Sequence, residues 1–472
     1  MRYWQICPLG PTGFGDSPYQ SFSAFAGNPY LVDWKPLVQA DLISVDELEP
    51  LHRLPRDHTD YGLLYETFWP LMERVATRYF ARKPKPALYG DLEAFFESHQ
   101  EWLDPYAWFM VLKKSHFGGS WDVWGPRYRT YSAARKTGLP KEPGETGFWK
   151  EVFYQYLFWG QWKELKAYAN SIGIQIIGDL PIFVSYDSSD LWSQPDFFQI
   201  HKKSGELKAV AGVPPDFFSA DGQLWGNPLY DWEAMAKDGF KWWMRRFAAC
   251  FELYDVLRID HFRGFHDYWR IPAGAETAID GEWVDGPGLP FFQVTREHFP
   301  DARIIAEDLG ELSPGVDVLR RQTGLPGMAV LQFAFDQPTN AFLPHHHEQN
   351  LVVYSGTHDN DTSWGWFQQA AESTRDFFRR YLQVDGSSVP WDLIRAAYKS
   401  PARLAIIPLQ DLLSLGTEAR FNTPGTGSGN WQWRYDPRQL QDLTQASGDY
   451  LRELSWIYNR NQPPSMGIPQ DS

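Results

Sequence analysis

Cysteine is almost absent from this chain of 472 residues, which holds only Cys7 and Cys250. Two cysteines supply neither a disulfide framework nor the paired spacing of a zinc site, so we expect no metal site. The sequence also lacks the run of about 18 apolar residues that a membrane-spanning helix needs, and its first residues lack the apolar segment of a secretory signal. These absences predict a reduced, cytoplasmic protein with no membrane partner.

Basic residues are too few to balance the acidic ones, because 44 Lys and Arg stand against 59 Asp and Glu and give a formal net charge of −15. Such a charge disfavours binding to phosphate backbones, so we expect no nucleic-acid partner, whereas a neutral substrate is compatible with it. Aromatic residues, in contrast, make up 17% of the chain. Composition alone favours a large aromatic core over ring surfaces that stack on sugars, and it leaves the oligomeric state open.

Short apolar runs that end in polar residues or glycine are the main signal of secondary structure. The seven runs are YWQICPL (3–9), IQIIGDLPI (174–182), DVLRIDHF (255–262), RIIAEDLG (303–310), MAVLQFAF (328–335), LVVYSGTHD (351–359) and LAIIPLQDLL (404–413). Their length and β-branched residues predict buried parallel strands, and helical patterns such as 154–173 and 314–324 lie between them. This alternation, without a glycine-rich phosphate loop, favours an α/β fold of the TIM (β/α)₈-barrel type over a doubly wound sheet.

The chain is long enough for a barrel of about 250 residues with large insertions. We expect residues 1–472 to form a single catalytic barrel domain. Within it, residues 35–150 predict a mostly helical insertion, and residues 183–250 predict a loop-rich insertion over the active site, irregular at 209–228. The last residues, 459–472, have the composition of a loose tail.

Carboxylates follow four of the predicted strands: Asp179, Asp260, Glu307 and Asp359. One such residue alone is more often a helix cap or half of a salt bridge, but four at the same end of parallel strands indicate an active-site face. Glycoside chemistry needs a nucleophile, a general acid/base and a group that steadies an oxocarbenium-like transition state. Arg258 faces the same side as Asp260, either as a structural ion pair or as the cation that keeps a nucleophile charged.

Three of these strand ends carry distinctive motifs, LRIDHFRGF, IIAEDLG and SGTHDNDT. They resemble the signatures of the amylomaltase-type 4-α-glucanotransferases, glycoside hydrolase family 77, which are relatives of the α-amylases. The resemblance covers nearly the whole chain in the expected order. It extends to PLGPTGFGDSPYQSFSAFAGNPYL, GDLPIFV, GVPPDFFSADGQLWGNP and GLPGMAVLQFAFD.

The resemblance implies a role for each matching residue. Asp260 matches the nucleophile, Glu307 the general acid/base and Asp359 the carboxylate that stabilises the transition state. Arg258 and His358 match the partners beside these groups. The remaining matches line the donor and acceptor subsites: Tyr19, Asp179, Asp216, Trp225 and Asn422. The family uses no metal and no organic cofactor.

The implied reaction transfers segments of α-1,4-glucans between maltooligosaccharides by double displacement with retention. Transfer requires that the acceptor out-competes water, and loops 209–228 and 416–430 are the expected covers of the intermediate. The family usually carries a strand and helix before the RYWQ segment, so we expect a barrel that lacks its first βα unit. Two alternatives are an α-1,4-glucan hydrolase with the same carboxylates and an inactive glucan-binding protein.

Overall fold

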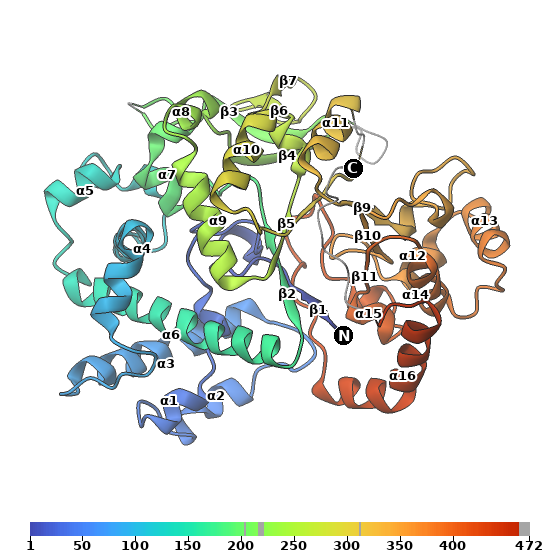
Figure 1. Ribbon diagram of the computed structural model, residues 1–472. Coiled ribbons are helices and arrows are strands. Elements are labelled where there is room, and N and C mark those ends of the chain that lie inside the picture. The colour runs from blue at the N-terminus through green and yellow to red at the C-terminus, as the bar shows by residue number, and fades with distance from the viewer. Residues whose placement is uncertain (203, 216–220, 311–312, 462–472) are drawn as a thin grey trace. The chain divides into compact units, whose positions relative to one another are not determined.

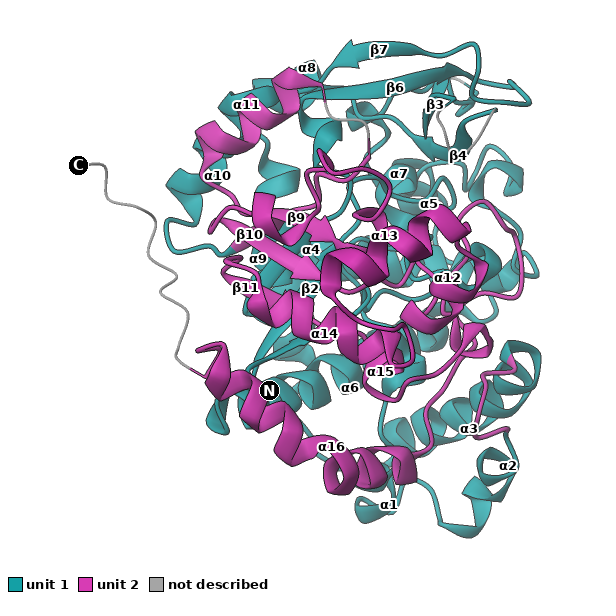
Figure 2. Cartoon of the chain, turned by 90° about the vertical axis from the view of Figure 1, so that its right-hand side faces the viewer, with its two compact units in different colours: residues 1–54, 61–303 teal, residues 55–60, 304–472 magenta. Residues whose placement is uncertain are grey.

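The computed structural model describes residues 1–202, 204–215, 221–310 and 313–461 (Figure 1). The chain divides into two compact units, which Figure 2 distinguishes by colour. Unit 1 comprises residues 1–54 and 61–303, and unit 2 comprises residues 55–60 and 304–472.

Three parallel strands form the centre of unit 1, in the order β1, β2, β5. They are β1 (Tyr3–Gln5), β2 (Gln175–Leu180) and β5 (Val256–Ile259). All but the first residue of β2 and every residue of β5 are buried, because both faces of these strands are covered. The register pairs Asp179 with Arg258, which places two charged residues side by side near the strand ends.

Helices make up most of the first 171 residues of unit 1, including the range 35–150. They are α1 (Lys35–Gln39), α2 (Glu49–His52), α3 (Tyr61–Ala81), α4 (Leu92–Ser115), α5 (Tyr131–Thr137) and α6 (Gly144–Ser171). Many of the aromatic rings pack inside this unit: its fully buried side chains include Trp121, Trp159, Trp192, Trp242 and Trp243. The assignment of 35–150 as an insertion remains a prediction.

A second, antiparallel sheet corrects the expectation of an irregular loop at 209–228. Its strand order is β4, β3, β6, β7. The strands are β3 (Ala209–Val213), β4 (Gln223–Pro228), β6 (Asp267–Pro272) and β7 (Glu282–Asp285). The glycines and prolines of this range concealed two strands because β3 gains its second partner, β6, from a segment about 55 residues further along the chain.

The rest of 183–250 is also more regular than the predicted loop-rich insertion. It carries α7 (Ser189–Ser193), α8 (Trp232–Lys237) and most of α9 (Lys241–Leu253). Helix α10 (Gly288–His298) then precedes the end of unit 1.

Unit 2 contains the other four predicted strands: β8 (Ile304–Ala306), β9 (Gly327–Val330), β10 (Leu351–Tyr354) and β11 (Leu404–Ile406). The last three are parallel, in the order β11, β10, β9, and the Ala306 amide donates to the Pro326 carbonyl at 2.9 Å. All seven apolar runs therefore contain a strand, as predicted, although β1 and β11 are only partly buried and not buried as expected. The expected tail is described only as far as residue 461.

Helices alternate with these strands: α11 (Pro314–Thr323), α12 (Ser363–Gln369), α13 (Glu372–Leu382), α14 (Val389–Lys399), α15 (Leu409–Leu412) and α16 (Pro437–Ile457). Helix α11 begins after Ser313 with Pro314 in its first turn and ends at Gly324, whose φ of 71° is readily adopted by glycine. The core of unit 2 packs around Phe335, Phe367 and Phe378. Among the residues that the structure describes, none of the helices combines the length and the apolar composition that a membrane span needs.

Gly178 in β2 allows the buried ring of Tyr254 to lie directly against the strand that carries Asp179. A Cβ atom at residue 178 would lie 2.2 Å from that ring. We predict that Gly178→Ala lowers the free energy of unfolding by about 1–3 kcal/mol, the usual cost of overpacking a core. Gly427→Ala is the control, because a Cβ there meets nothing within 4 Å. Thermal melting curves measure the difference, and equal melting temperatures for the two variants would contradict this packing.

Candidate active site

Arg258 holds two carboxylates at the ends of β2 and β5. Its Nη1 lies 2.6 Å from Oδ2 of Asp179 and 3.0 Å from Oδ1 of Asp260. The side chains of Arg258 and Asp179 are 4% and 1% exposed, whereas that of Asp260 is 28% exposed. The guanidinium therefore binds one buried carboxylate and one that a ligand can reach. An adjacent cation also favours the charged form of a carboxylate, as a nucleophile requires.

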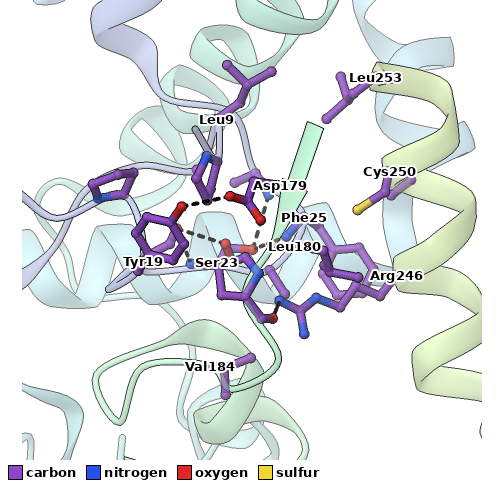
Figure 3. Close-up of a pocket in the computed structure, with 18 of the residues that line it drawn as sticks. Leu9, Tyr19, Ser23, Phe25, Asp179, Leu180, Val184, Arg246, Cys250 and Leu253 are labelled. Carbon is purple, nitrogen blue, oxygen red and sulfur yellow. Dashed lines mark hydrogen bonds between the residues drawn. The ribbon is translucent and has the colours of Figure 1, made fainter. Parts of the chain in front are cut away.

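Tyr19 completes this cluster from the loop after β1. Its hydroxyl donates to Oδ2 of Asp179 at 2.7 Å, and Figure 3 shows the ring pointing toward that carboxylate. Burial, reinforced by the charge of Asp179, raises the pKa of Tyr19 well above its usual value, so the phenol keeps its proton as a donor. The two side chains are thus a fixed donor–acceptor pair in unit 1.

A cavity of about 60 Å³ adjoins this pair and is lined by Ser23, Phe25, Arg246 and Cys250, among others (Figure 3). This volume is small beside the roughly 300–1,000 Å³ of usual ligand pockets, so the cavity by itself does not define a sugar subsite.

Trp225 lies on β4 and touches the residue that follows Asp260. Its ring and that of His261 meet edge to face, with centroids 4.9 Å apart, and its Nε1 donates to Gln223 at 3.1 Å. His261 has a left-handed backbone (φ 51°), and burial lowers its pKa to about 4, so the imidazole is neutral at pH 7. Sequence reasoning missed His261, although its place directly after the predicted nucleophile was a signal. Asp216 lies outside the described residues.

Glu307 follows β8 in unit 2, where its Oε1 accepts a hydrogen bond from the amide of Leu309 at 2.9 Å. The next residue, Asp308, is buried and anchors the end of the strand. It accepts from the amide of Met328 at 2.7 Å and pairs with Arg320 at 2.9 Å. Burial raises the pKa of Asp308 to about 6, against the opposing effects of these two partners. Of these two neighbouring acids, Asp308 is therefore buried and held by the protein, whereas Glu307 is half-buried.

Asp359 follows β10 and is surrounded by partners from unit 2. Its Oδ2 lies 3.3 Å from Nε2 of His358, and its Oδ1 accepts from Nδ2 of Asn422 at 2.6 Å. Arg420 donates to the backbone carbonyls of both Asp359, at 3.2 Å, and Asn422, at 2.9 Å. Unit 2 therefore brings together His358, Asp359 and Asn422 of the predicted set. Arg420, which sequence reasoning missed, fixes the two segments.

The comparisons with known proteins agree with the motifs. Residues 1–441 match the family model of glycoside hydrolase family 77, described as 4-alpha-glucanotransferase. The chain belongs to this family. It is 47% identical over 449 residues to the 4-alpha-glucanotransferase of Thermus thermophilus, covering 93% of this chain and 88% of the relative. It is 44% identical over 466 residues to that of Synechocystis sp., covering 96% and 90%.

Solved structures give the same answer. The amylomaltase from Streptococcus agalactiae in complex with acarbose has a TM-score of 0.91 at 36% identity, covering 98% of this chain and 92% of that one. The amylomaltase from Corynebacterium glutamicum, at 17% identity and a TM-score of 0.72, covers 94% and 68% and supports the fold alone. The family resemblance and the assignment as a glycosyltransferase with an α/β, amylase-like fold are confirmed.

The buried guanidinium makes a specific prediction for stability. Arg258→Met leaves the carboxylates of Asp179 and Asp260 without their cation, and breaking a buried ion pair costs about 3–5 kcal/mol. Arg53→Met is the matched control, because the pair of Arg53 with Glu49 is 76% and 56% exposed and such pairs contribute about 0–1 kcal/mol. Urea unfolding measures both losses. A loss for Arg258→Met no larger than that for Arg53→Met would refute the role of the cation.

Proposed function

We propose that this enzyme transfers segments of α-1,4-glucans between maltooligosaccharides with retention of configuration at the anomeric carbon. The observation that carries the proposal is the reachable carboxylate of Asp260 held against the buried guanidinium of Arg258, in a chain of which residues 1–441 match the family model. The names of the relatives, 4-alpha-glucanotransferase, supply the substrate class. The near absence of cysteine suits work in a reducing compartment, the cytoplasm.

The finer fold that we propose is a (β/α)₈-type barrel in one catalytic domain. The support is the TM-score of 0.91 to an amylomaltase and the parallel pairing of β1, β2 and β5 and of β9, β10 and β11. In such barrels the catalytic residues come from the C-terminal ends of several strands. Asp260, Glu307 and Asp359 each follow the C-terminal end of a strand.

In the first half-reaction Asp260 attacks the anomeric carbon of the donor glucan. The bond from that carbon to the glycosidic O4 breaks, and Glu307 gives its proton to the departing O4. The product is a β-linked glucosyl ester on Asp260, with one inversion at the carbon. Asp359 holds sugar hydroxyls and stabilises the positive charge that develops on the ring.

In the second half-reaction an acceptor glucan takes the place of the leaving chain. Glu307, now a carboxylate, removes the proton of the acceptor 4-hydroxyl, and the oxygen attacks the anomeric carbon. The ester bond to Asp260 breaks and a new α-1,4 bond forms, so that two inversions give net retention. Both catalytic carboxylates return to their starting states.

The other predicted residues orient the sugar in this proposal. Trp225 offers a ring that can stack on a pyranose, and Tyr19 and His358 offer polar groups to hydroxyls. Asp179 acts through Tyr19 and Arg258, because its own side chain is 1% exposed. Asp216 and Asn422 are the two remaining residues that we propose to contact the donor or the acceptor glucan.

Transfer rather than hydrolysis depends on excluding water from the glucosyl ester. We assign this task to the segment 209–228, which contains β3 and β4, and to the segment 416–430. A hydrolase with the same carboxylates is the alternative, and it differs in its products. Maltotriose given to a transferase yields free glucose and a ladder of longer glucans, whereas a hydrolase yields glucose and maltose alone.

We predict that Asp260→Asn lowers transfer from maltotriose at least about a thousandfold, as expected when a nucleophile is removed. Asp267→Asn is the control, because its carboxylate pairs with Arg263 at 2.8 Å in the same region of the chain. Chromatography of the products over time measures both variants. Longer glucans formed by Asp260→Asn at the parent rate would refute the nucleophile, and a parent enzyme that releases only glucose and maltose would refute transfer.

A further inference from the structure

Asp411 is a buried carboxylate that accepts three hydrogen bonds in unit 2. It lies on the short helix α15 after β11 and is 1% exposed. Its Oδ2 accepts from the hydroxyls of Ser355 and Ser363, each at 2.6 Å, and its Oδ1 accepts from the amide of Ser363 at 2.8 Å. No lysine or arginine among the described residues forms a salt bridge with it. Neutral donors alone therefore hold this charge.

The two serines mark the ends of the segment that carries Asp359. Ser355 directly follows β10, and Ser363 is the first residue of α12. Both are completely buried. The amide of Ser363 is one of the first-turn N–H groups that a helix cannot satisfy internally. One carboxylate thus joins both ends of residues 355–363 and caps the helix that follows.

Bonds within the segment make it stiff between these ends. The Asn360 side chain accepts from the amide and the hydroxyl of Thr357, both at 2.8 Å. Gln332 donates to the carbonyl of Asp361 at 2.9 Å. Asp359 lies between these anchor points, so a shift of either end of the segment displaces its carboxylate.

We infer that Asp411 is a positioning residue for Asp359: it fixes both ends of the 355–363 segment and so sets the place of the carboxylate that stabilises the transition state. The inference rests on the proposed function of Asp359. Asp411 itself touches no sugar. It acts by fixing the position of the Asp359 carboxylate relative to the positively charged transition state. A displacement of about 1 Å there lowers the rate by up to roughly a hundredfold.

The chemistry of the side chain separates two substitutions. Asp411→Ala leaves two hydroxyls and one amide without their acceptor in a buried place, which loosens both ends of the segment. Asp411→Asn keeps the shape: its oxygen can accept from the Ser363 amide, and its NH₂ group can donate to the serine hydroxyls, which also accept. The conservative variant should therefore recover most of the function that Asp411→Ala loses.

The test uses the full-length enzyme with two donors, maltotriose and α-maltosyl fluoride. Fluoride departs without a proton, so the fluoride donor bypasses the acid role of Glu307 but still needs Asp260 and Asp359. We expect Asp411→Ala to lower kcat about ten- to a hundredfold on both donors, with KM changed by less than about threefold. Asp411→Asn should stay within about tenfold of the parent. Glu307→Gln should lose activity on maltotriose, whereas on the fluoride it should still release about one fluoride ion per enzyme molecule, because only the second half-reaction then lacks its base.

Asp392→Ala is the matched control, because Asp392 is another buried aspartate of unit 2, paired with Arg395 on α14. The Asp392→Ala variant should be less stable than the parent. It should keep the parent kcat at temperatures where its circular dichroism spectrum matches that of the folded parent. If Asp411→Ala retains kcat as Asp392→Ala does, the inference is wrong even where Asp260→Asn is inactive. Should Asp411→Ala fail to fold, Ser355→Ala removes one bond alone, and an unchanged kcat there also overturns the inference. Transfer by Asp260→Asn would instead overturn the proposed function.

Discussion

The ion pairs of Arg258 are the interaction on which the rest of unit 1 depends. A buried guanidinium is costly unless its charge is matched, and the strand register matches it by placing Asp179 beside it on β2 and Asp260 two residues further along. Tyr19 then ties the loop after β1 to the same charges through Asp179. Chain segments more than 150 residues apart thus meet at one cation, and the carboxylate proposed as nucleophile receives a fixed place.

The carboxylates near the strand ends fall into two groups by their surroundings. Asp179, Asp308 and Asp411 have side-chain or residue exposures of 1%, 7% and 1% and bind the protein's own donors. The side chains of Asp260 and Asp359 are 28% and 42% exposed. The first group holds backbone and side chains in place, and the second group can meet a sugar. Only the exposed carboxylates are therefore available to react with a glucan, although many acidic residues lie near the strand ends.

Apolar runs predicted all seven of these strands, and the signal is clearest where a strand is buried on both faces, as in β2, β5 and β9. The same signal was missing for β3 and β4, because β3 gains its second partner, β6, from a distant segment and the glycines and prolines of both strands resemble a loop. The motifs predicted Asp260, Glu307 and Asp359 together with the neighbours Arg258, His358 and Asn422, but they did not predict Asp411 or Arg420. Asp411 and Arg420 act through hydrogen bonds across the fold, and such contacts cannot be predicted from spacing along the chain.

In the proposed mechanism Asp260 carries the glucosyl group between donor and acceptor. The most direct test is mass spectrometry of the Glu307→Gln variant after reaction with α-maltosyl fluoride, which forms the ester without an acid but, lacking the base, releases it slowly. We expect a protein heavier by one maltosyl group, with the added mass on the peptide that contains Asp260. Label on Asp179, on Asp359 or on no peptide at all, while the fluoride is consumed, would contradict it.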